Sequence, residues 1–253
     1  MAAPVTSPLF AALSDIGLRR QENQDSYGYF RGEGAAAIKG HLLVVADGMG
    51  GHQGGAVASR LAVDTIVGLY RSTEAGSPSE ILREAFRRAS ESILQAARQK
   101  PELASMGTTC TALALVDNHA YLVHVGDTRA YLIRAGRIQR LTADQTWVQA
   151  MAAEGLITRS EAERHPDRNI LMQALGTPTP PMPVSLPEPL PIQANDTFLL
   201  CSDGLSGLVD DDELRELALA DPDPQQACAR LVELAKARGG DDNITVLLLK
   251  IPA

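Results

Sequence analysis

The stretch HLLVVADGMGGH, residues 41–52, joins a dense apolar run to an aspartate and a cluster of glycines. The apolar part predicts a buried strand that ends at Asp47, and the glycines after it predict a tight turn. Aspartate recurs in the same setting at Asp203, in CSDGLSG (201–207), and at Asp242, in GGDDNIT (239–245). One Asp-Gly pair alone predicts only a turn. Three carboxylates at strand ends could converge on one or two Mg²⁺ or Mn²⁺ ions, which prefer oxygen ligands.

Helices and further strands are predicted on the C-terminal side of this stretch. Apolar residues recur at helical spacing over residues 53–71 and 79–99, and Ser77 before Pro78 is a suitable helix start. A meander of antiparallel strands is then expected, with turns at Asp117-Asn118 and Asp127-Thr128. Its strands cover residues 108–116, 120–126, 130–134 and the segment after Ala135-Gly136.

The second half of the chain combines an insertion with a return to strands and helices. Residues 144–176 are polar and helix-prone, and the proline-rich stretch that follows predicts an extended connection. Strands are expected at 197–202 and 244–250, with helices at 210–220 and 224–238 between them. This order lacks regular βαβ alternation and favours an α+β fold in which helices cover two antiparallel sheets. We expect residues 1–253 to form a single domain that contains the insertion.

Composition restricts the classes of function. The 253 residues are 45% hydrophobic and 21% charged, as in ordinary soluble proteins, and the net charge is −8. This acidic balance argues against nucleic-acid binding, which requires clustered lysine and arginine. The three cysteines lie in apolar runs, which predicts buried thiols rather than disulfides. The sequence shows no signal peptide and no apolar run of membrane-spanning length, so we expect a cytoplasmic protein without a membrane segment.

Seven ordered blocks resemble the metal-dependent protein phosphatases of type 2C, in particular their bacterial branch. They are SDIGLRRQENQDSYG (14–28), VVADGMGGHQGGAVAS (44–59), MGTTCTALAL (106–115), VHVGDTRAYLIRAGRIQRLTADQT (123–146), HPDRNILMQALG (165–176), LLCSDGLSGLV (199–209) and GGDDNITVLLL (239–249). The resemblance implies a four-layer α-β-β-α sandwich of two antiparallel β-sheets flanked by helix pairs, with a two-metal site in a cleft at one end. It also identifies residues 144–176 as the family's variable flap.

The resemblance assigns roles to individual residues of the site. Asp47 would bridge two cations, either Mn²⁺ or Mg²⁺, and the backbone carbonyl of Gly48 would bind one of them. Asp203 and Asp242 would complete the other position, and Asp25 would support the site directly or through water. The remaining roles are substrate phosphate binding by Arg20, orientation of Asp242 or a bound water by Asn243, and binding of a weaker third cation by Asp127.

The same resemblance implies a reaction. Two cations lower the pKa of a bridging water and supply hydroxide near neutral pH, which would attack the phosphorus of phosphoserine or phosphothreonine. No cysteine nucleophile is required. The expected partners are phosphoproteins, including a bacterial serine/threonine kinase, and the enzyme is expected to be a monomer.

Some assignments stay open at this point. Animal relatives have a histidine in DGHGG where this chain has Met49; the nearest histidine is His52, so the general acid is unassigned.

Two other functions use similar residues: a catalytically silent module that binds phosphoproteins, and a metal-dependent phosphodiesterase. Retention of the whole acidic set favours the phosphatase over the silent module, because binding alone does not need it.

Overall fold

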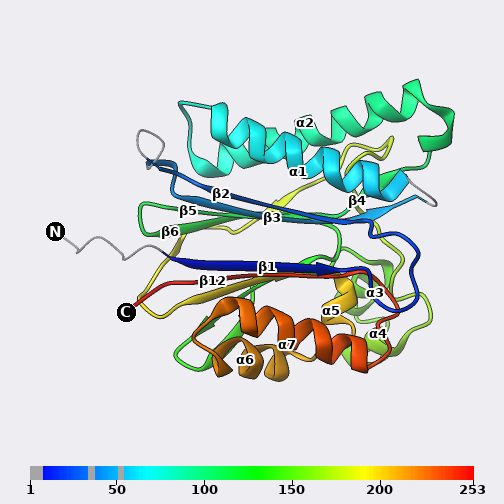
Figure 1. Cartoon of the computed structure of the whole chain (residues 1–253). Helices are drawn as coiled ribbons and strands as arrows, with labels where there is room; N and C mark the ends of the chain where they lie inside the picture. The colour runs from blue at the N-terminus through cyan, green and yellow to red at the C-terminus, as the bar shows by residue number, and fades with distance from the viewer. Residues whose placement is uncertain (1–7, 34–37, 51–53) are drawn as a thin grey trace.

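The structure is a computed structural model, and it describes residues 8–33, 38–50 and 54–253. Two antiparallel sheets lie face to face, and helices cover the outer face of each, as Figure 1 shows. The first sheet has the strand order β1 (Leu9–Asp15), β12 (Ile244–Lys250), β11 (Thr197–Cys201), β7 (Arg129–Arg134) and β8 (Arg137–Arg140). The four-layer sandwich expected from the sequence is therefore confirmed.

The second sheet contains the strand from which the sequence analysis began. Its order is β10 (Leu190–Pro191), β6 (His119–Val125), β5 (Cys110–Val116), β3 (His41–Met49) and β2 (Asp25–Arg31). Two short strands join it at the side, β4 (Gly107–Thr108) on β3 and β9 (Val184–Ser185) on β6. The proline-rich stretch, which includes β9 and β10, is extended as predicted.

The helices form an outer pair on each sheet and a set of short pieces. The long pair α1 (Gly54–Ser72) and α2 (Pro78–Gln99) packs on the second sheet, and α6 (Asp211–Ala220) with α7 (Pro224–Ala237) packs on the first. Short helices are η2 (Pro101–Leu103), α3 (Trp147–Ala153), α4 (Arg159–Arg164) and α5 (Asp203–Ser206). In the part of the chain that the structure describes, no helix combines the length and apolar character needed to cross a membrane.

Strands that are buried on both faces explain the continuous apolar runs in the sequence. Successive residues of a strand point to opposite faces. In β12, Val246 and Leu248 pack under α6 and α7, whereas Leu247 and Leu249 face the other sheet. The alternation therefore builds three apolar layers from strands that have no polar face.

The structure corrects the predicted meander. Strands β5 and β6 form a hairpin in the second sheet, with Asp117 and Asn118 at positive φ in its turn, as expected for a tight hairpin. Strands β7 and β8 form the next hairpin, but they belong to the first sheet. The Asp127-Thr128 segment is thus a crossover between the sheets and not a hairpin turn. A crossover and a turn use the same polar residues, which is why the sequence pattern did not separate them.

Two of the long strands were not predicted. β1 and β2 each lie at the edge of a sheet and are only partly buried. Edge strands lack the continuous apolar run that marks the central ones. These two strands matter for the site because the loop between them carries Arg20, and β2 begins at Asp25.

Candidate active site

The predicted ligands lie where strands of the two sheets end beside one another. Asp25, the first residue of β2, pairs directly with Asp47 on β3. Asp203 begins α5 just after β11, and Asp242 lies just before β12, which is hydrogen-bonded to β11. The expected strand end at Asp47 is wrong, because β3 continues to Met49 through its pairing with β4. The backbone of Gly48 is therefore held by a neighbouring strand rather than by a turn.

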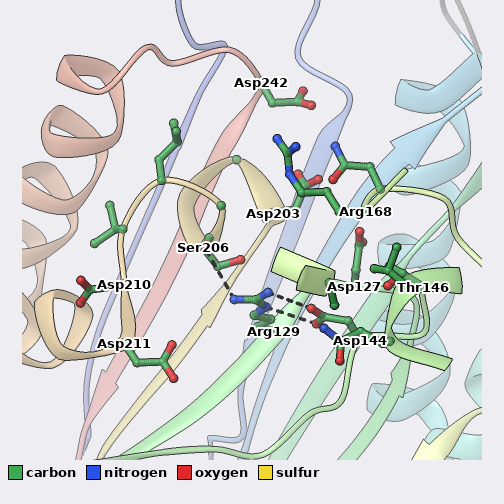
Figure 2. Close-up of a pocket in the computed structure, with 18 of the residues that line it drawn as sticks. Asp127, Arg129, Asp144, Thr146, Arg168, Asp203, Ser206, Asp210, Asp211 and Asp242 are labelled. Atoms are coloured by element: carbon green, nitrogen blue, oxygen red, sulfur yellow. Dashed lines mark hydrogen bonds and ion pairs between the residues drawn. The ribbon is translucent and has the colours of Figure 1, made fainter. Parts of the chain in front are cut away.

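A cavity of about 490 Å³ gathers these groups. Asp47, Gly48, Asp127, Asp203 and Asp242 all line it, and Arg20 stands at the same cavity. A second cavity of about 850 Å³ shares four of these residues and extends between the flap and α5, where Figure 2 shows Asp127, Asp203 and Asp242 converging from separate segments. Asp25 lines neither cavity and lies buried behind Asp47.

Two glycines allow the close backbone approach that the site requires. A Cβ atom on Gly48 would lie 2.0 Å from the carbonyl oxygen of Gly55, and one on Gly204 would lie 2.0 Å from that of Asn243. Any side chain at either position would push these segments apart. The glycines beside Asp47 and Asp203 are thus a steric requirement of the site.

Two threonines fix the backbone of Asp47. Thr109 donates its N–H to the carbonyl oxygen of Asp47 at 2.9 Å, and its hydroxyl accepts from the N–H of Asp47 at 3.2 Å. The Thr108 hydroxyl donates to the same Asp47 carbonyl at 2.8 Å. Sequence reasoning assigned these residues only to a strand. The signal was present in MGTTC, where two polar residues interrupt an otherwise apolar stretch.

Burial and mutual repulsion dominate the electrostatics of the acidic group. Burial raises the pKa of Asp47 well above its usual range, and the neighbouring Asp25 carboxylate raises it further. Burial likewise raises the pKa of Asp25 and of Asp127 to about 7, and that of Asp203 is raised by burial and by Asp242. Bound cations would reverse this penalty because they stabilise the ionised carboxylates.

The donor set fits divalent cations. Oxygen Oδ1 of Asp25 and Oδ1 of Asp203 are buried and have no hydrogen-bond partner among the described residues. The charge of Asp203 also raises the pKa of Asp47, so a bound cation would offset the repulsion between these two carboxylates. Within the described ranges, no three acidic, histidine or cysteine side chains already enclose an ion by themselves. Mg²⁺ and Mn²⁺ suit such an open arrangement, since Mg²⁺ typically uses one or two carboxylates and keeps several waters.

Arg20 stands at the mouth of the cavity. Its Nη2 donates to Oδ2 of Asp242 at 2.6 Å, and the side chain remains half exposed. This hydrogen bond, together with the charges of Asp242 and Asp47, raises the pKa of Arg20 and keeps the guanidinium charged. A planar guanidinium at this place can bind a phosphate through two parallel hydrogen bonds.

Asn243 supports Arg20 as well as Asp242. Its backbone N–H donates to Oδ1 of Asp242 at 2.8 Å, so it contacts the predicted partner through the main chain. Its side chain is used elsewhere: Oδ1 accepts from the N–H of Gln24 at 2.8 Å, and Nδ2 donates to the carbonyls of Ile16 and Glu22 at 3.0 and 3.1 Å. These three bonds close the β1–β2 loop around Arg20.

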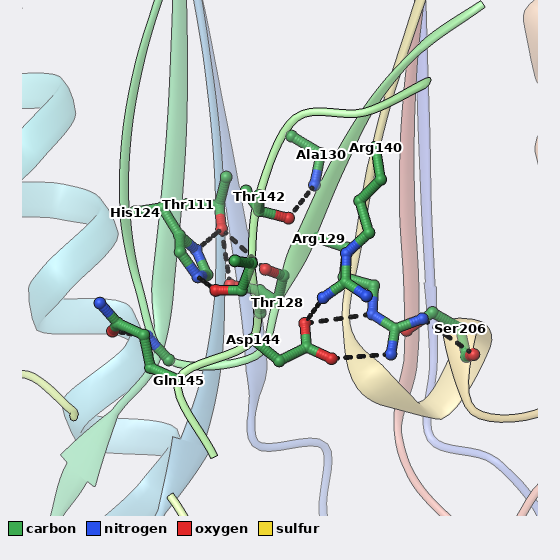
Figure 3. A network of polar contacts seen from close by, with 12 residues as sticks. Thr111, His124, Thr128, Arg129, Ala130, Arg140, Thr142, Asp144, Gln145 and Ser206 are labelled. Atoms are coloured by element: carbon green, nitrogen blue, oxygen red, sulfur yellow. Dashed lines mark hydrogen bonds and ion pairs between the residues drawn. The ribbon is translucent and has the colours of Figure 1, made fainter. Parts of the chain in front are cut away.

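Asp127 is held on both sides by the network in Figure 3. On one side, Gly126 donates its N–H to Oε1 of Gln145 at 2.8 Å. On the other, the Thr128 hydroxyl lies 2.7 Å from that of Thr111, which in turn lies 2.8 Å from Nδ1 of His124. Burial lowers the pKa of His124 to about 4, so this histidine is neutral and holds the network through hydrogen bonds.

The segment after Asp127 is tied to the base of the flap. Arg129 binds Asp144 through Nε at 3.2 Å and Nη2 at 2.8 Å, and Arg140 contacts the same carboxylate. The side chain of Asp144 is nearly buried. This ion-pair group fixes the crossover against the segment where the flap begins, and Arg129 also reaches the carbonyl of Ser206 on α5. Hydrogen bonds and ion pairs of Arg129 therefore link the crossover to the base of the flap and to the helix that begins at Asp203.

The last two sequence predictions concern the three cysteines and the histidine nearest to the acidic group. Cys110, Cys201 and Cys228 are buried free thiols, as expected. His52, the histidine nearest to the acidic group in the sequence, lies outside the described residues.

Comparison with known proteins agrees with this geometry. The family model of protein phosphatase 2C matches residues 19–242. The chain is 39% identical over 242 residues to the serine/threonine protein phosphatase PstP of Mycobacterium tuberculosis, covering 96% of this chain and 45% of PstP. It thus spans about half the length of that curated relative. It is 33% identical to the serine/threonine phosphatase stp of Listeria monocytogenes, covering 94% of this chain and 93% of that protein.

Solved structures extend the agreement to three dimensions. A crystal structure of M. tuberculosis PstP superposes with a TM-score of 0.85 at 38% identity, covering 97% of this chain and 99% of the other. The PstP catalytic domain in complex with two manganese ions gives a TM-score of 0.82 at 37% identity and the same coverages. Fold and sequence therefore agree, and the chain belongs to the protein phosphatase 2C family.

Proposed function

We propose that this chain is a metal-dependent protein serine/threonine phosphatase whose residues 1–253 act as one catalytic domain. The observation that carries the proposal is the 490 Å³ cavity, in which four carboxylates, the backbone of Gly48 and the guanidinium of Arg20 come together. Manganese in the related PstP domain supports two divalent cations, Mn²⁺ or Mg²⁺, at this place. Their chemistry when bound is to provide a water molecule that ionises near neutral pH as the nucleophile.

Different residues of the site are assigned to different cation positions. Asp47 would contribute to both cation positions, the carbonyl of Gly48 would contribute to one of them, and Asp203 with Asp242 would contribute to the other. Asp25 supports Asp47 from behind, and its Oδ2 accepts from the Ser202 hydroxyl at 2.6 Å. Asp127 with Asp203 would hold a weaker third cation.

Arg20 holds and neutralises the substrate phosphate. Its hydrogen bond to Asp242 orients the guanidinium before substrate arrives, so less conformational entropy is lost on binding. The phosphate would thereby be held in the cavity that Asp47 also lines. Release of the serine or threonine hydroxyl and of inorganic phosphate completes the reaction.

The cellular setting belongs to the same proposal. The enzyme acts as a monomer in the cytoplasm on phosphoproteins, including a bacterial serine/threonine kinase. Similarity to bacterial serine/threonine phosphatases supports phosphoproteins as the partners. The net charge of −8 offers no footprint for nucleic acid as an alternative partner.

A single assay tests the activity against its two alternatives. Purified protein is incubated with a phosphothreonine peptide, with bis-p-nitrophenyl phosphate as a diester and with no substrate, each with Mn²⁺ or EDTA. We expect Mn²⁺-dependent phosphate release from the peptide and little from the diester. Peptide binding without release would favour a silent module, and preferential diester cleavage would favour a phosphodiesterase.

Asn243→Ala should impair substrate binding through Arg20. The substitution removes three hydrogen bonds that close the Arg20 loop, each worth about 1 kcal/mol. We expect kcat/KM for the phosphopeptide to fall about tenfold, mostly through KM. Gln139→Ala, which removes an exposed amide on β8, is the matched control. An unchanged KM in folded Asn243→Ala protein would contradict this role.

A further inference from the structure

Exposed apolar side chains gather beside the catalytic cavity. Of the twelve large apolar side chains that are exposed in the described part of the chain, six lie between residues 147 and 184. Four of the six surround one antiparallel bridge, Thr146 with Leu171. They form what we call the apolar rim, with exposed fractions of 41%, 51%, 56% and 70% for Trp147, Ile170, Met172 and Met182.

Backbone hydrogen bonds hold the apolar rim together. Trp147 donates its N–H to the carbonyl of Ile170 at 2.9 Å, and Met172 donates to that of Gln145 at 2.8 Å. Met182 is joined to the same place, since its N–H donates to Oε1 of Gln173 at 3.1 Å. The four side chains are therefore displayed from a fixed backbone and not from a loose loop.

The apolar rim is continuous with the site of the chemistry. Leu171 and Met172 line the same cavity as Asp47 and Asp203. A chain segment whose phosphorylated residue entered that cavity would pass directly over Met172. Clustered exposed apolar groups of this kind mark interaction sites in soluble proteins.

We propose that the apolar rim binds a large apolar side chain next to the phosphorylated residue of the protein substrate. The inference rests on the proposed phosphatase function and names a substrate class for it: phosphoserine or phosphothreonine flanked by leucine, methionine or an aromatic residue. Two of the four rim residues are methionines, whose flexible thioether side chains adapt to partners of different shape. The rim therefore selects for apolar character rather than for one residue type.

The kinetic test compares phosphothreonine peptides that differ only in the residues adjoining the phosphothreonine. Leucine is placed directly before it, directly after it or at neither position, with serine elsewhere, and aspartate peptides serve as a further comparison. For wild-type enzyme with Mn²⁺, we expect kcat/KM to be about tenfold higher for at least one leucine peptide than for the serine peptide.

A double variant tests whether the apolar rim causes that preference. Ile170→Gln/Met182→Gln changes two exposed side chains outside the cavity lining, and we expect the leucine-to-serine ratio to fall to about one. Each rate is divided by the same variant's rate on p-nitrophenyl phosphate, so that a general loss of activity cancels. Leu219→Gln, an exposed apolar residue on α6, is the matched control and should keep the preference.

Trp147 provides a readout that does not depend on catalysis. It is the single tryptophan of the chain, so its emission reports the apolar rim directly. Dephosphorylated leucine peptide, titrated into the Mn²⁺-loaded enzyme, should shift this emission to shorter wavelength in a saturable way, and the serine peptide should not.

The outcomes separate the inference from the activity on which it rests. Absence of hydrolysis for every peptide would reject the proposed function. Hydrolysis of all peptides with equal kcat/KM, a stronger preference for aspartate, or a leucine preference that survives in Ile170→Gln/Met182→Gln would overturn the role of the apolar rim.

Discussion

Replacing Asp47 by asparagine is expected to reduce kcat by about 10³-fold or more while making the metal-free protein more stable. Activity falls because an amide carries no charge with which to hold two cations. Stability rises because Asp47 is buried among other acids, which raises its pKa and makes its ionised form costly. A higher melting temperature than that of wild type is expected at pH 8 in EDTA, by roughly 2–4 °C for each kcal/mol of repulsion that is removed.

Thermal melting with and without Mn²⁺ checks both the loss of cation binding and the gain in stability of the metal-free protein. Wild-type protein should gain about 2.7 kcal/mol when Mn²⁺ is present at 100 times its dissociation constant, and Asp47→Asn should gain much less. Asp64→Asn, at an exposed aspartate of α1, should behave like wild type. A metal-free Asp47→Asn protein that is less stable than wild type would show that Asp47 has a structural role that outweighs the repulsion.

The central part of the fold was predictable because its strands are buried on both faces. Such strands, β3, β5, β11 and β12 among them, need continuous apolar runs, and these runs are visible in the sequence. The edge strands β1 and β2 are half exposed, so their sequences are mixed and carry little signal. The assignment of each hairpin to a sheet was likewise not encoded locally, because Asp127-Thr128 could serve equally as a turn or as a crossover.

The acidic residues of the site were predictable for a different reason. Asp47, Asp203 and Asp242 each adjoin an apolar strand and small residues; one such aspartate alone predicts only a turn, and it is their shared setting together with the resemblance that predicts their convergence. The supporting contacts were not predictable. The side chain of Asn243 reaches the backbone of Gln24, which lies 219 positions away in the sequence, and nothing local indicates such a partner. Ser202, Thr108 and Thr109 act in the same way through tertiary contacts.

In the metal-free protein the buried aspartates should lower stability as the pH rises from 5 to 8, opposite to the usual behaviour of aspartates in ion pairs. Burial raises the pKa of Asp25 to about 7 in the folded state, whereas an aspartate in the unfolded chain has a pKa of about 3.9. Between these values the folded state binds more protons than the unfolded state, so the free energy of unfolding falls as the pH rises through the folded pKa. Asp127, with a pKa also raised to about 7, acts in the same direction.

Urea unfolding in EDTA at pH 5, 6, 7 and 8 measures this slope. The expected loss is on the order of 3 kcal/mol for Asp25, less than additive with Asp127 because the groups interact. The pH window lies above the range in which carboxylates whose ion pairs lower their pKa, such as Glu84 and Glu213, lose their contribution. His124 acts in the opposite direction between pH 5 and about 6.5, because burial lowers its pKa to about 4 and only the unfolded state binds the proton there. The difference between wild type and Asp25→Asn, which share His124, isolates the contribution of the aspartate. Asp25→Asn, which still offers an acceptor to the Ser202 hydroxyl, should flatten the profile, whereas Asp64→Asn should not.

Saturating Mn²⁺ should reverse the sign of the slope. Cations bind the ionised carboxylates and compete with protons, so the stabilisation by Mn²⁺ must grow as the pH rises through the same range. The acidic group would then destabilise the empty protein and stabilise the loaded one, which couples folding of this end of the sandwich to metal supply. An EDTA profile that is the same in Asp25→Asn as in wild type would mean that these carboxyl groups are already ionised and solvated without metal.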